Sequence, residues 1–328
     1  MKIHYSTDNI KLETSLDNNS FPLEETIRDL RGITPVVTIG IFDGVHTGHV
    51  ALLNKTAELA KLYNKESLIL TFYPHPRIVL SQDKGKLKLL TTQSEKMRQL
   101  ARLEIDNILI LPFTFEIASL TAEQFIEEFL VKQLNVSRLV IGNNHRFGKG
   151  GISFGKLEKI CKKFNIGLDK FALIDISNLI PSSTKIRDLL LKGNIQQANK
   201  LLGYNYSIEG KVIEGDKIGR ELSFPTANLS VSEPKKLVPA NGVYACYVKV
   251  RDKTYKGMAN IGFRPTIVKK NRHSSIEVHI LDFDENIYYE NIEIEFVEKI
   301  RDEIHFPNLK DLIKQIELDK LYFPLHSS

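Results

Sequence analysis

A run of glycines and histidines placed directly behind two valines most constrains what this chain can fold into. Residues 38–49 read Thr-Ile-Gly-Ile-Phe-Asp-Gly-Val-His-Thr-Gly-His and follow the valines at 36–37. Behind them Leu53, Ala57 and Ala60 recur at the spacing of one apolar helix stripe. The segment therefore predicts a strand that enters a helix through a tight loop, which is the building unit of an α/β domain.

The predicted loop and helix start are suited to binding a phosphate group. A helix N-terminus offers unpaired N–H groups and a partial positive charge. Glycines such as Gly40 allow the backbone to approach a ligand closely. The imidazoles of His46 and His49 can each donate a hydrogen bond to a phosphoryl oxygen. The alternative is a glycine-rich turn whose histidines only face solvent.

The same residues carry a resemblance to a known family. His46 and His49 form the H-x-G-H signature of nucleotidyltransferases, and the longer G-x-F-D-G-V-H-x-G-H begins at Gly40. It resembles the FMN adenylyltransferase half of bacterial bifunctional riboflavin kinase/FAD synthetases. The resemblance implies that Gly40, Phe42, Asp43, His46 and His49 bind ATP. It also implies that the two histidines act in catalysis by stabilising negative charge, while Asp43 orders the loop or helps to place Mg²⁺.

Predicted strands and helices alternate up to Gly203. The strands are expected at 2–5, 67–73, 108–111, 138–142 and near 168–174, and the helices at 50–64, 92–103, from 121 onward, near 154–164 and at 195–202. Thr92 with Glu95, and Thr121 with Gln124, have the spacing of capping boxes at helix starts. The alternation predicts βαβ units and a parallel sheet, and with the resemblance it indicates a Rossmann-like nucleotidyltransferase domain.

A basic loop follows the predicted strand 138–142, with the sequence Asn-Asn-His-Arg-Phe-Gly-Lys-Gly-Gly at 143–151. Ligands of open parallel sheets bind beyond the carboxyl ends of strands, so this loop suits an anion. A basic turn without a ligand is the alternative. The loop resembles the family pattern G-x-[DN]-F-x-F-G, which implies that Asn144 binds ATP. His145 replaces the family's aromatic residue, and the glycines after Gly148 depart from the family's spacing.

A second anion-binding pattern, Pro-Ser-Ser-Thr-Lys-Ile-Arg, stands at 181–187. Ser183 and Thr184 are N-cap residue types that open an apolar helix. Arg187 lies in the first turn, where a cation is disfavoured by up to about 1 kcal/mol, and a bound anion would offset this cost. The pattern resembles the S-S-T-x-I-R motif of the FAD synthetase branch, which implies that these three residues bind the ATP phosphates.

The pattern changes after Gly203 from alternating helices and strands to nearly all strands. A chain of 328 residues also exceeds the roughly 250 to 300 residues at which single cores stop growing. We therefore predict two domains, 1–203 and 204–328. In the second domain, short β-rich runs broken by Gly, Pro and Asp predict a small closed antiparallel barrel, and the helix 309–318 follows it.

The second domain resembles riboflavin kinases over nearly its whole length. The residues that carry the resemblance are Pro-Thr-Ala-Asn at 225–228, Gly-Met-Ala-Asn-Ile-Gly-Phe-Arg-Pro-Thr at 257–266 and Glu-Val-His at 277–279. Ser223 departs from the family, which mostly has glycine before Phe-Pro-Thr-Ala-Asn. The resemblance implies that this domain phosphorylates riboflavin with ATP.

Residue spacing in the second domain supports kinase chemistry. Thr226 and Asn228 are two residues apart, so on an extended backbone they point to the same side. Their hydroxyl and carbonyl oxygens suit Mg²⁺, which takes few protein ligands. Glu277 shares a strand face with His279, opposite Val278. Taken alone, Glu277 is a solvated strand residue; with the resemblance it is the candidate general base for the ribityl hydroxyl.

Two further predictions concern ligand contacts of the second domain. Gly210, Gly215 and Gly219 are expected to form a flexible phosphate loop that is not a Walker motif, with Arg220 beside it. Arg301 falls where the family places flavin contacts, although charge clusters before a helix are common.

Composition narrows the functional classes. The net charge of +5 suits small polyanions such as ATP and is too weak to indicate nucleic-acid binding. Cys161 and Cys246 are far apart and show neither zinc-ligand spacing nor a disulfide framework. Residues 1–20 have no apolar signal region, and no apolar run reaches the roughly 18 residues of a membrane span. A soluble cytoplasmic protein is expected.

The sequence thus predicts a bifunctional enzyme that converts riboflavin to FMN and FMN to FAD, with ATP as co-substrate and Mg²⁺ as cofactor. Two alternatives stay open. One is a monofunctional kinase whose first domain is a flavin- or nucleotide-binding regulator, suggested by His145 and the glycines after Gly148. The other is a non-enzymatic flavin carrier or an RNA-binding regulator. Whether the chain forms a homo-oligomer is also open.

Overall fold

The structure is a computed structural model that describes residues 1–5, 30, 32–80, 87–142, 148–172, 180–215, 224–263 and 274–321. It divides into two compact units, Met1–Ile180 and Pro181–Ser328, and each is described by itself. The boundary between functional domains at 203/204 stays a prediction. In the described part of the chain, no helix has the length and apolar character needed to cross a membrane.

The first unit is built on a six-stranded sheet with the order β1-β4-β3-β2-β5-β6. Its strands are β1 (Lys2–Tyr5), β2 (Val36–Ile39), β3 (Ser67–Tyr73), β4 (Asn107–Pro112), β5 (Arg138–Gly142) and β6 (Gly167–Phe171). All neighbouring strands pair in parallel, which confirms the predicted parallel sheet. The strand order reverses direction between β2 and β5. In such sheets this reversal marks the crevice where ligands bind.

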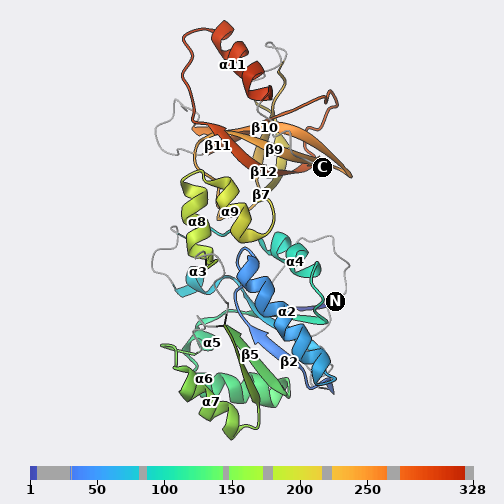
Figure 1. Cartoon of the computed structure of the whole chain (residues 1–328), viewed down its shortest axis with the longest axis vertical. Coiled ribbons are helices and arrows are strands. Elements are labelled where there is room, and N and C mark those ends of the chain that lie inside the picture. Colours follow the sequence, from blue (N-terminus) through green and yellow to red (C-terminus); the bar gives the residue numbers. More distant parts are fainter. Residues whose placement is uncertain are drawn as a thin grey trace. The chain divides into compact units, whose positions relative to one another are not determined.

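Helices cover both faces of this sheet (Figure 1). They are α2 (Thr47–Leu62), α3 (Pro76–Leu80), α4 (Gln93–Ala101), α5 (Phe115–Ser119), α6 (Ala122–Phe125), the π-helical η1 (Ile126–Gln133) and α7 (Phe154–Lys163). Successive strand residues point to opposite faces. Val36 therefore joins a core with α2 and α4, whereas Val37 joins a core with α6, η1 and α7.

Local sequence signals fix several helix ends. Thr92 and Thr121 each form a complete capping box at the start of α4 and α6, as predicted. The sequence pattern did not predict the π-helical continuation of α6. In the second unit, α8 (Ser183–Leu191) precedes α9 (Ile195–Leu202), and α9 ends at Gly203 with φ 83°. This left-handed conformation favours glycine, so Gly203 is the predicted stop signal.

A closed barrel with the strand order β10-β11-β8-β7-β12-β9 forms most of the second unit. Its strands are β7 (Ser207–Ile213), β8 (Ala227–Val231), β9 (Gly242–Val250), β10 (Lys253–Phe263), β11 (Ser274–Ile280) and β12 (Asn291–Arg301), and the helix α11 (Leu309–Leu321) follows. Every neighbouring pair is antiparallel. The predicted small antiparallel barrel with a terminal helix is confirmed (Figure 1).

The helix α9 is fastened to the barrel through one asparagine. The Asn199 side chain donates to the carbonyl of Phe296 on β12 at 2.8 Å and accepts from the N–H of Tyr206 at 2.8 Å. Tyr206 is fully buried, and its hydroxyl donates to the carbonyl of Leu237 at 2.6 Å. These bonds join the α8–α9 segment to β7 and β12 within one unit.

Candidate active sites

The loop between β2 and α2 is held in place by Asp43. This carboxylate is 5 % exposed and accepts hydrogen bonds from the N–H of Leu90 at 3.0 Å, and from the N–H and hydroxyl of Thr91 at 3.1 and 3.3 Å. The N–H of Gly44 in turn donates to the Thr91 hydroxyl at 3.1 Å. Asp43 therefore orders the loop, the first of the two roles considered for it.

The same loop has a strained backbone. Phe42, Gly44 and Val45 all have positive φ, at 53°, 84° and 33°, and for a β-branched residue such as Val45 this is a rare conformation. The ring of Phe42 is 2 % exposed and occupies the space beside Gly40, where an added Cβ would lie 2.7 Å from Cζ. Gly40 thus makes room for the Phe42 ring. Such strain persists where packing enforces it, often at functional sites.

His46 and His49 are stacked at the start of α2. His46 is the N-cap residue, and its Nδ1 accepts from the N–H of His49 at 3.2 Å. Because Nδ1 accepts, the proton of a neutral His46 sits on Nε2, which is then a donor. The two rings lie 3.6 Å apart with an angle of 15° between their planes. The Nδ1 of His49 is buried and has no hydrogen-bond partner within the described ranges.

Burial keeps both imidazoles neutral. Desolvation lowers the pKa of His46 from 6.5 to about 4, more than Asp43 raises it. The pKa of His49 lies well below 6.5, chiefly because of burial and then because of His46 and Lys96. At neutral pH the pair offers N–H donors without positive charge, which fits the hydrogen-bonding role predicted from the sequence.

Lys96, on α4, is a further polar group beside this loop, and it was missed in the sequence. It is 6 % exposed, and its Nζ lies 3.4 Å from both the carbonyl oxygen of Ile41 and the hydroxyl of Thr71. Its burial could have been inferred from its position four residues before Leu100, on the apolar stripe of the helix. A lysine on a buried stripe is unusual.

The structure does not test the other residues predicted for the first reaction. Asn144 and His145 are outside the described residues. Ser183, Thr184 and Arg187 belong to the second unit, in the first two turns of α8. The N-cap is Ser182, whose hydroxyl accepts from the N–H of Lys185 at 3.2 Å. The predicted caps, Ser183 and Thr184, thus lie one and two residues after the N-cap that the structure shows.

Strand register places the residues of the second site in one row. Glu277 on β11 lies opposite Asn228 on β8 and opposite Asn260 on β10. Directly opposed residues share one face of a sheet, so these three polar side chains lie together. Ile276 and Val278, the residues on either side of Glu277 in β11, are 1 % and 0 % exposed. They face the barrel interior, so the row of polar side chains faces away from it. The residue spacing predicted that apolar and polar side chains alternate along β11. It did not predict that β8 and β10 flank β11.

The segment before β8 is tied to β11 by a histidine. The Nδ1 of His279 lies 2.8 Å from the carbonyl oxygen of Pro225, and because a carbonyl only accepts, Nδ1 carries the proton. The His279 ring also packs edge-on against Phe224 at 5.6 Å, and the ammonium of Lys320 on α11 lies 4.5 Å from the Phe224 ring centre. These contacts fix the chain on either side of Pro225, next to Thr226.

The structure describes two of the three glycines of the predicted phosphate loop. Gly210 lies within β7, and an added Cβ would meet the carbonyl oxygen of Ser230 at 2.4 Å. Strand packing therefore explains this glycine, and its assignment to a flexible loop was wrong. At Gly215 an added Cβ would lie 2.0 Å from Nδ2 of Asn228, so the glycine admits the asparagine amide. Gly219 and Arg220 are outside the described residues.

Arg301 holds the terminal helix against the barrel. Its Nε lies 3.0 Å from Oδ2 of Asp319 and its Nη2 2.8 Å from the same oxygen. Asp319 is 3 % exposed and also accepts from Gln315 at 2.8 Å. The Nη1 of Arg301 also donates a hydrogen bond to the carbonyl oxygen of Asp302 at 3.0 Å. The structure thus gives Arg301 a structural partner, and direct flavin binding stays a prediction.

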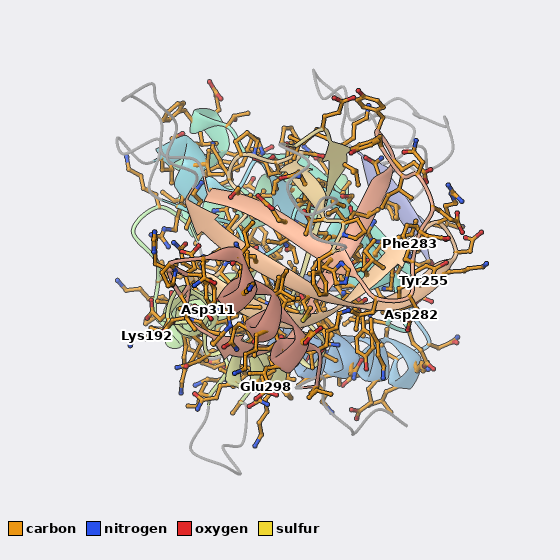
Figure 2. All side chains as sticks on the ribbon, turned by 90° about the horizontal axis from the view of Figure 1, so that it is seen from above. Lys192, Tyr255, Asp282, Phe283, Glu298 and Asp311 are labelled. Carbon is orange, nitrogen blue, oxygen red and sulfur yellow. The ribbon has the colours of Figure 1, made fainter. Side chains whose placement is uncertain are left out.

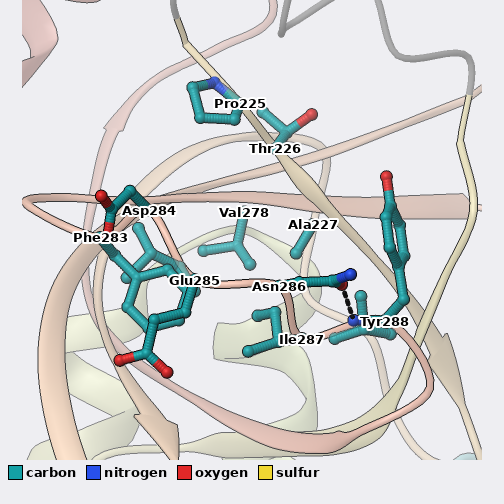
Figure 3. Close-up of a pocket in the computed structure, with 12 residues that line it drawn as sticks. Pro225, Thr226, Ala227, Val278, Phe283, Asp284, Glu285, Asn286, Ile287 and Tyr288 are labelled. Atoms are coloured by element: carbon teal, nitrogen blue, oxygen red, sulfur yellow. Dashed lines mark hydrogen bonds between the residues drawn. The ribbon is translucent and has the colours of Figure 1, made fainter.

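A pocket of about 310 Å³ opens at the end of the barrel beside Thr226 (Figure 3). Apolar side chains from several strands and polar residues of the loop after β11 line it: Val212, Pro225, Thr226, Ala227, Val278, Ile280, Phe283, Asp284, Glu285, Asn286, Ile287 and Tyr288. Phe283 is supported by Tyr255 on β10, whose ring centre lies 4.9 Å away (Figure 2). An apolar pocket with a few polar groups is typical of small-molecule binding.

Comparisons with known proteins agree in both halves of the chain. A family model described as FAD synthetase matches residues 32–185, and one described as riboflavin kinase matches residues 202–323. A Listeria monocytogenes protein named bifunctional riboflavin kinase/FMN adenylyltransferase is 38 % identical over 291 residues, which cover 88 % of this chain and 91 % of that protein. The Escherichia coli K12 protein of the same name is 37 % identical over 288 residues, 87 % of this chain and 90 % of that protein.

A solved structure matches as well. A crystal structure of a Streptococcus pneumoniae protein, described as a macrolide-efflux protein, superimposes with a TM-score of 0.84 and 29 % sequence identity. The match covers 92 % of this chain and 97 % of that one.

Proposed function

The chain belongs to the bifunctional riboflavin kinase/FMN adenylyltransferase family, and from this we propose how its residues divide two reactions. The barrel transfers the γ-phosphoryl group of ATP to riboflavin and forms FMN. The first reaction's product is the second reaction's substrate, because FMN then takes the AMP group of another ATP to give FAD and pyrophosphate. The observation that carries the kinase assignment is the register that sets Glu277 opposite Asn228.

In the kinase reaction the primary alcohol of riboflavin attacks the γ-phosphorus of ATP. The alcohol oxygen forms the new P–O bond, ADP leaves, and the alcohol proton passes to Glu277 as general base. A positioned base contributes on the order of 10²- to 10⁴-fold. Asn260, on the other side of Glu277 in the register, helps to orient the carboxylate.

Mg²⁺ fits the oxygen donors beside Glu277. Thr226 offers a hydroxyl and Asn228, which is 8 % exposed, an amide oxygen, both hard ligands of the kind that Mg²⁺ accepts together with nucleotide phosphates. When bound, the ion neutralises charge on the phosphates. The contact between His279 and Pro225 holds the backbone next to Thr226.

We assign the pocket beside Thr226 to the ATP of the kinase reaction. Thr226 belongs to the pocket lining and to the proposed metal ligands, so a nucleotide whose phosphates reach Thr226 has its base within the apolar part. Gly215, Gly219 and Arg220 are proposed to contact its phosphates. Arg301 is proposed to act in flavin binding by fixing α11 beside the barrel.

In the adenylyltransferase reaction a phosphate oxygen of FMN attacks the α-phosphorus of ATP, and pyrophosphate leaves. The second pKa of a phosphate monoester is near 6, so this nucleophile needs no general base at pH 7. The Nε2–H of His46 and the imidazole of His49 donate to phosphate oxygens as charge develops. Removal of one such donor costs roughly 3 to 4 kcal/mol.

Further contacts to this ATP come from residues predicted in the sequence. The loop residues Gly40, Phe42 and Asp43 shape the phosphate site. Asn144, together with Ser183, Thr184 and Arg187 at the start of α8, completes the proposed ATP contacts. Both reactions consume ATP, so we place the enzyme in the cytoplasm. The net charge of +5 is too weak to favour a nucleic-acid partner, and we propose no membrane partner.

Chromatography of the reaction products tests the proposal. The purified chain is incubated with ATP and Mg²⁺, in one reaction with riboflavin and in another with FMN, and FAD is expected in both. Glu277→Gln should abolish FMN formation but leave FAD formation from supplied FMN, and His49→Ala should do the reverse. Accumulation of FMN without any FAD would contradict the assignment of the first unit and favour a monofunctional kinase.

A further inference from the structure

The histidines of the first unit's phosphate loop supply no positive charge to a bound triphosphate. ATP brings a polyanionic triphosphate to this loop, and the reaction transfers negative charge to pyrophosphate. Both imidazoles are neutral at pH 7, because burial lowers their pKa values. The one carboxylate of the loop, Asp43, adds a negative charge. Within the loop itself, helix N–H groups and neutral donors face the anion.

Lys96 brings an ammonium group into contact with this loop. Its Nζ lies 3.4 Å from the carbonyl of Ile41, in the loop, and 3.4 Å from the hydroxyl of Thr71, at the carboxyl end of β3. Both contacts are at the long end for hydrogen bonds. Lys96 is also close enough to His49 to lower the pKa of that imidazole. The ammonium therefore lies near both the end of β3 and His49.

An ammonium in this position is costly to the fold. It is 6 % exposed, has three N–H donors, and forms two long contacts to uncharged oxygens in the described part of the chain. Asp43 is the nearby opposite charge, but the Asp43 oxygens are already bound by the N–H groups of Leu90 and Thr91. A buried charge with incomplete hydrogen bonds destabilises a protein. An apolar side chain of the same length would cost less.

We propose that Lys96 supplies a fixed positive charge beside the phosphate loop, and that its ammonium attracts the triphosphate of ATP and the pyrophosphate that leaves. The group stays charged in use: burial lowers its pKa only to about 8, and Asp43 opposes that effect. The ammonium also helps to keep His49 unprotonated by lowering its pKa, and burial keeps His46 neutral, so both imidazoles remain neutral N–H donors. Lys96 deepens the proposed adenylyltransferase function and rests on it.

The test uses variants that remove the positive charge of Lys96 but keep a side chain of similar length. Lys96→Met removes the ammonium, and Lys96→Gln removes the charge but keeps N–H donors for Ile41 and Thr71. Lys61→Met is the control, because Lys61 is a lysine of α2 whose side chain is 71 % exposed. Inorganic pyrophosphate with Mg²⁺ serves as the probe in isothermal titration, since pyrophosphate is a product of the first unit's reaction and not of the kinase reaction. FAD formation from FMN and the unfolding temperature are measured in parallel.

Lys96→Met and Lys96→Gln are both expected to weaken pyrophosphate binding by about 10- to 100-fold and to slow FAD formation by about 10²-fold or more. FMN formation from riboflavin should be unchanged. The unfolding temperature of Lys96→Met should be equal to that of the unmodified protein or higher, because a costly buried charge has been removed. Lys61→Met should leave all four quantities unchanged.

Other outcomes would overturn the proposal. If Lys96→Gln retained pyrophosphate binding and FAD formation, Lys96 would be a hydrogen-bonding support of the loop and its charge would not matter. If Lys96→Met lowered the unfolding temperature along with activity, the role would be structural. If the unmodified chain formed no FAD at all, the proposed function would fail, and the pyrophosphate titration would still decide whether Lys96 binds the anion.

Discussion

The fit between Gly215 and Asn228 allows a quantitative prediction for the kinase reaction. In Gly215→Ala the new Cβ would stand 2.0 Å from Nδ2 of Asn228, and an ordinary contact begins near 3.4 Å. Relieving the overlap requires a displacement of about 1.4 Å, the difference between those two distances. Asn228 is 8 % exposed and paired in register with Glu277, so its amide cannot move without leaving the proposed metal site. A misplacement of about 1 Å can cost roughly 10²-fold in rate.

We therefore expect Gly215→Ala to reduce kcat/KM for FMN formation by about 10²-fold or more and to raise the Mg²⁺ concentration needed for half-maximal rate. FAD formation from supplied FMN should not change, and it reports in the same sample that the chain is folded. Gly155→Ala on α7 is the matched control, because its added Cβ meets nothing within 4 Å. Full kinase activity in Gly215→Ala would refute the idea that Asn228 must occupy the space beside this glycine.

Two predictions concern stability. The pKa of His46 is about 4 when folded and 6.5 ordinarily, so neutral His46 contributes fully above pH 6.5, and up to about 3 kcal/mol is lost as the pH falls towards 4. His46→Asn keeps an N-cap acceptor but does not titrate. In calorimetry its free energy of unfolding should fall less between pH 7 and 5 than that of the unmodified protein, and an equal fall in both would contradict the burial argument. Asp319→Ala leaves Arg301 without its carboxylate and should cost about 3 to 5 kcal/mol in urea unfolding. The double variant Arg301→Met/Asp319→Leu should recover most of that loss, and no recovery would show that the charge is not the cause.

Local features of the fold were predictable from the sequence because their causes are local. The capping boxes at Thr92 and Thr121 depend on residues three positions apart. The end of α9 depends on the freedom of Gly203 to adopt a positive φ. The alternation of apolar and polar residues on β11 places Val278 inside and Glu277 outside the barrel. The prediction that residues 38–49 form a loop between a strand and a helix follows from the same kind of short-range pattern.

Features that depend on distant parts of the chain were not predictable in the same way. Asp43 is held by Leu90 and Thr91, 47 and 48 residues away. Arg301 pairs with Asp319, 18 residues away and on another element. Gly210 looked like a loop residue because glycine marks loops, yet it is required by the close approach of Ser230 in a neighbouring strand. In each case the partner is chosen by the tertiary fold, which single-sequence patterns do not contain.

The two carboxylates beside the proposed sites illustrate how the fold assigns chemical roles. Asp43 accepts several hydrogen bonds from the chain at Leu90 and Thr91, so its lone pairs are occupied and it serves to hold the loop. Glu277 instead lies on a strand face beside two asparagines, where the pairing of strands presents its carboxylate to a ligand. An alcohol must lose a proton to attack phosphorus, whereas a phosphate at neutral pH need not. In the mechanism proposed here, the presented carboxylate therefore stands where the reaction requires a base, and neutral histidines and a buried lysine stand where the reaction requires only charge stabilisation.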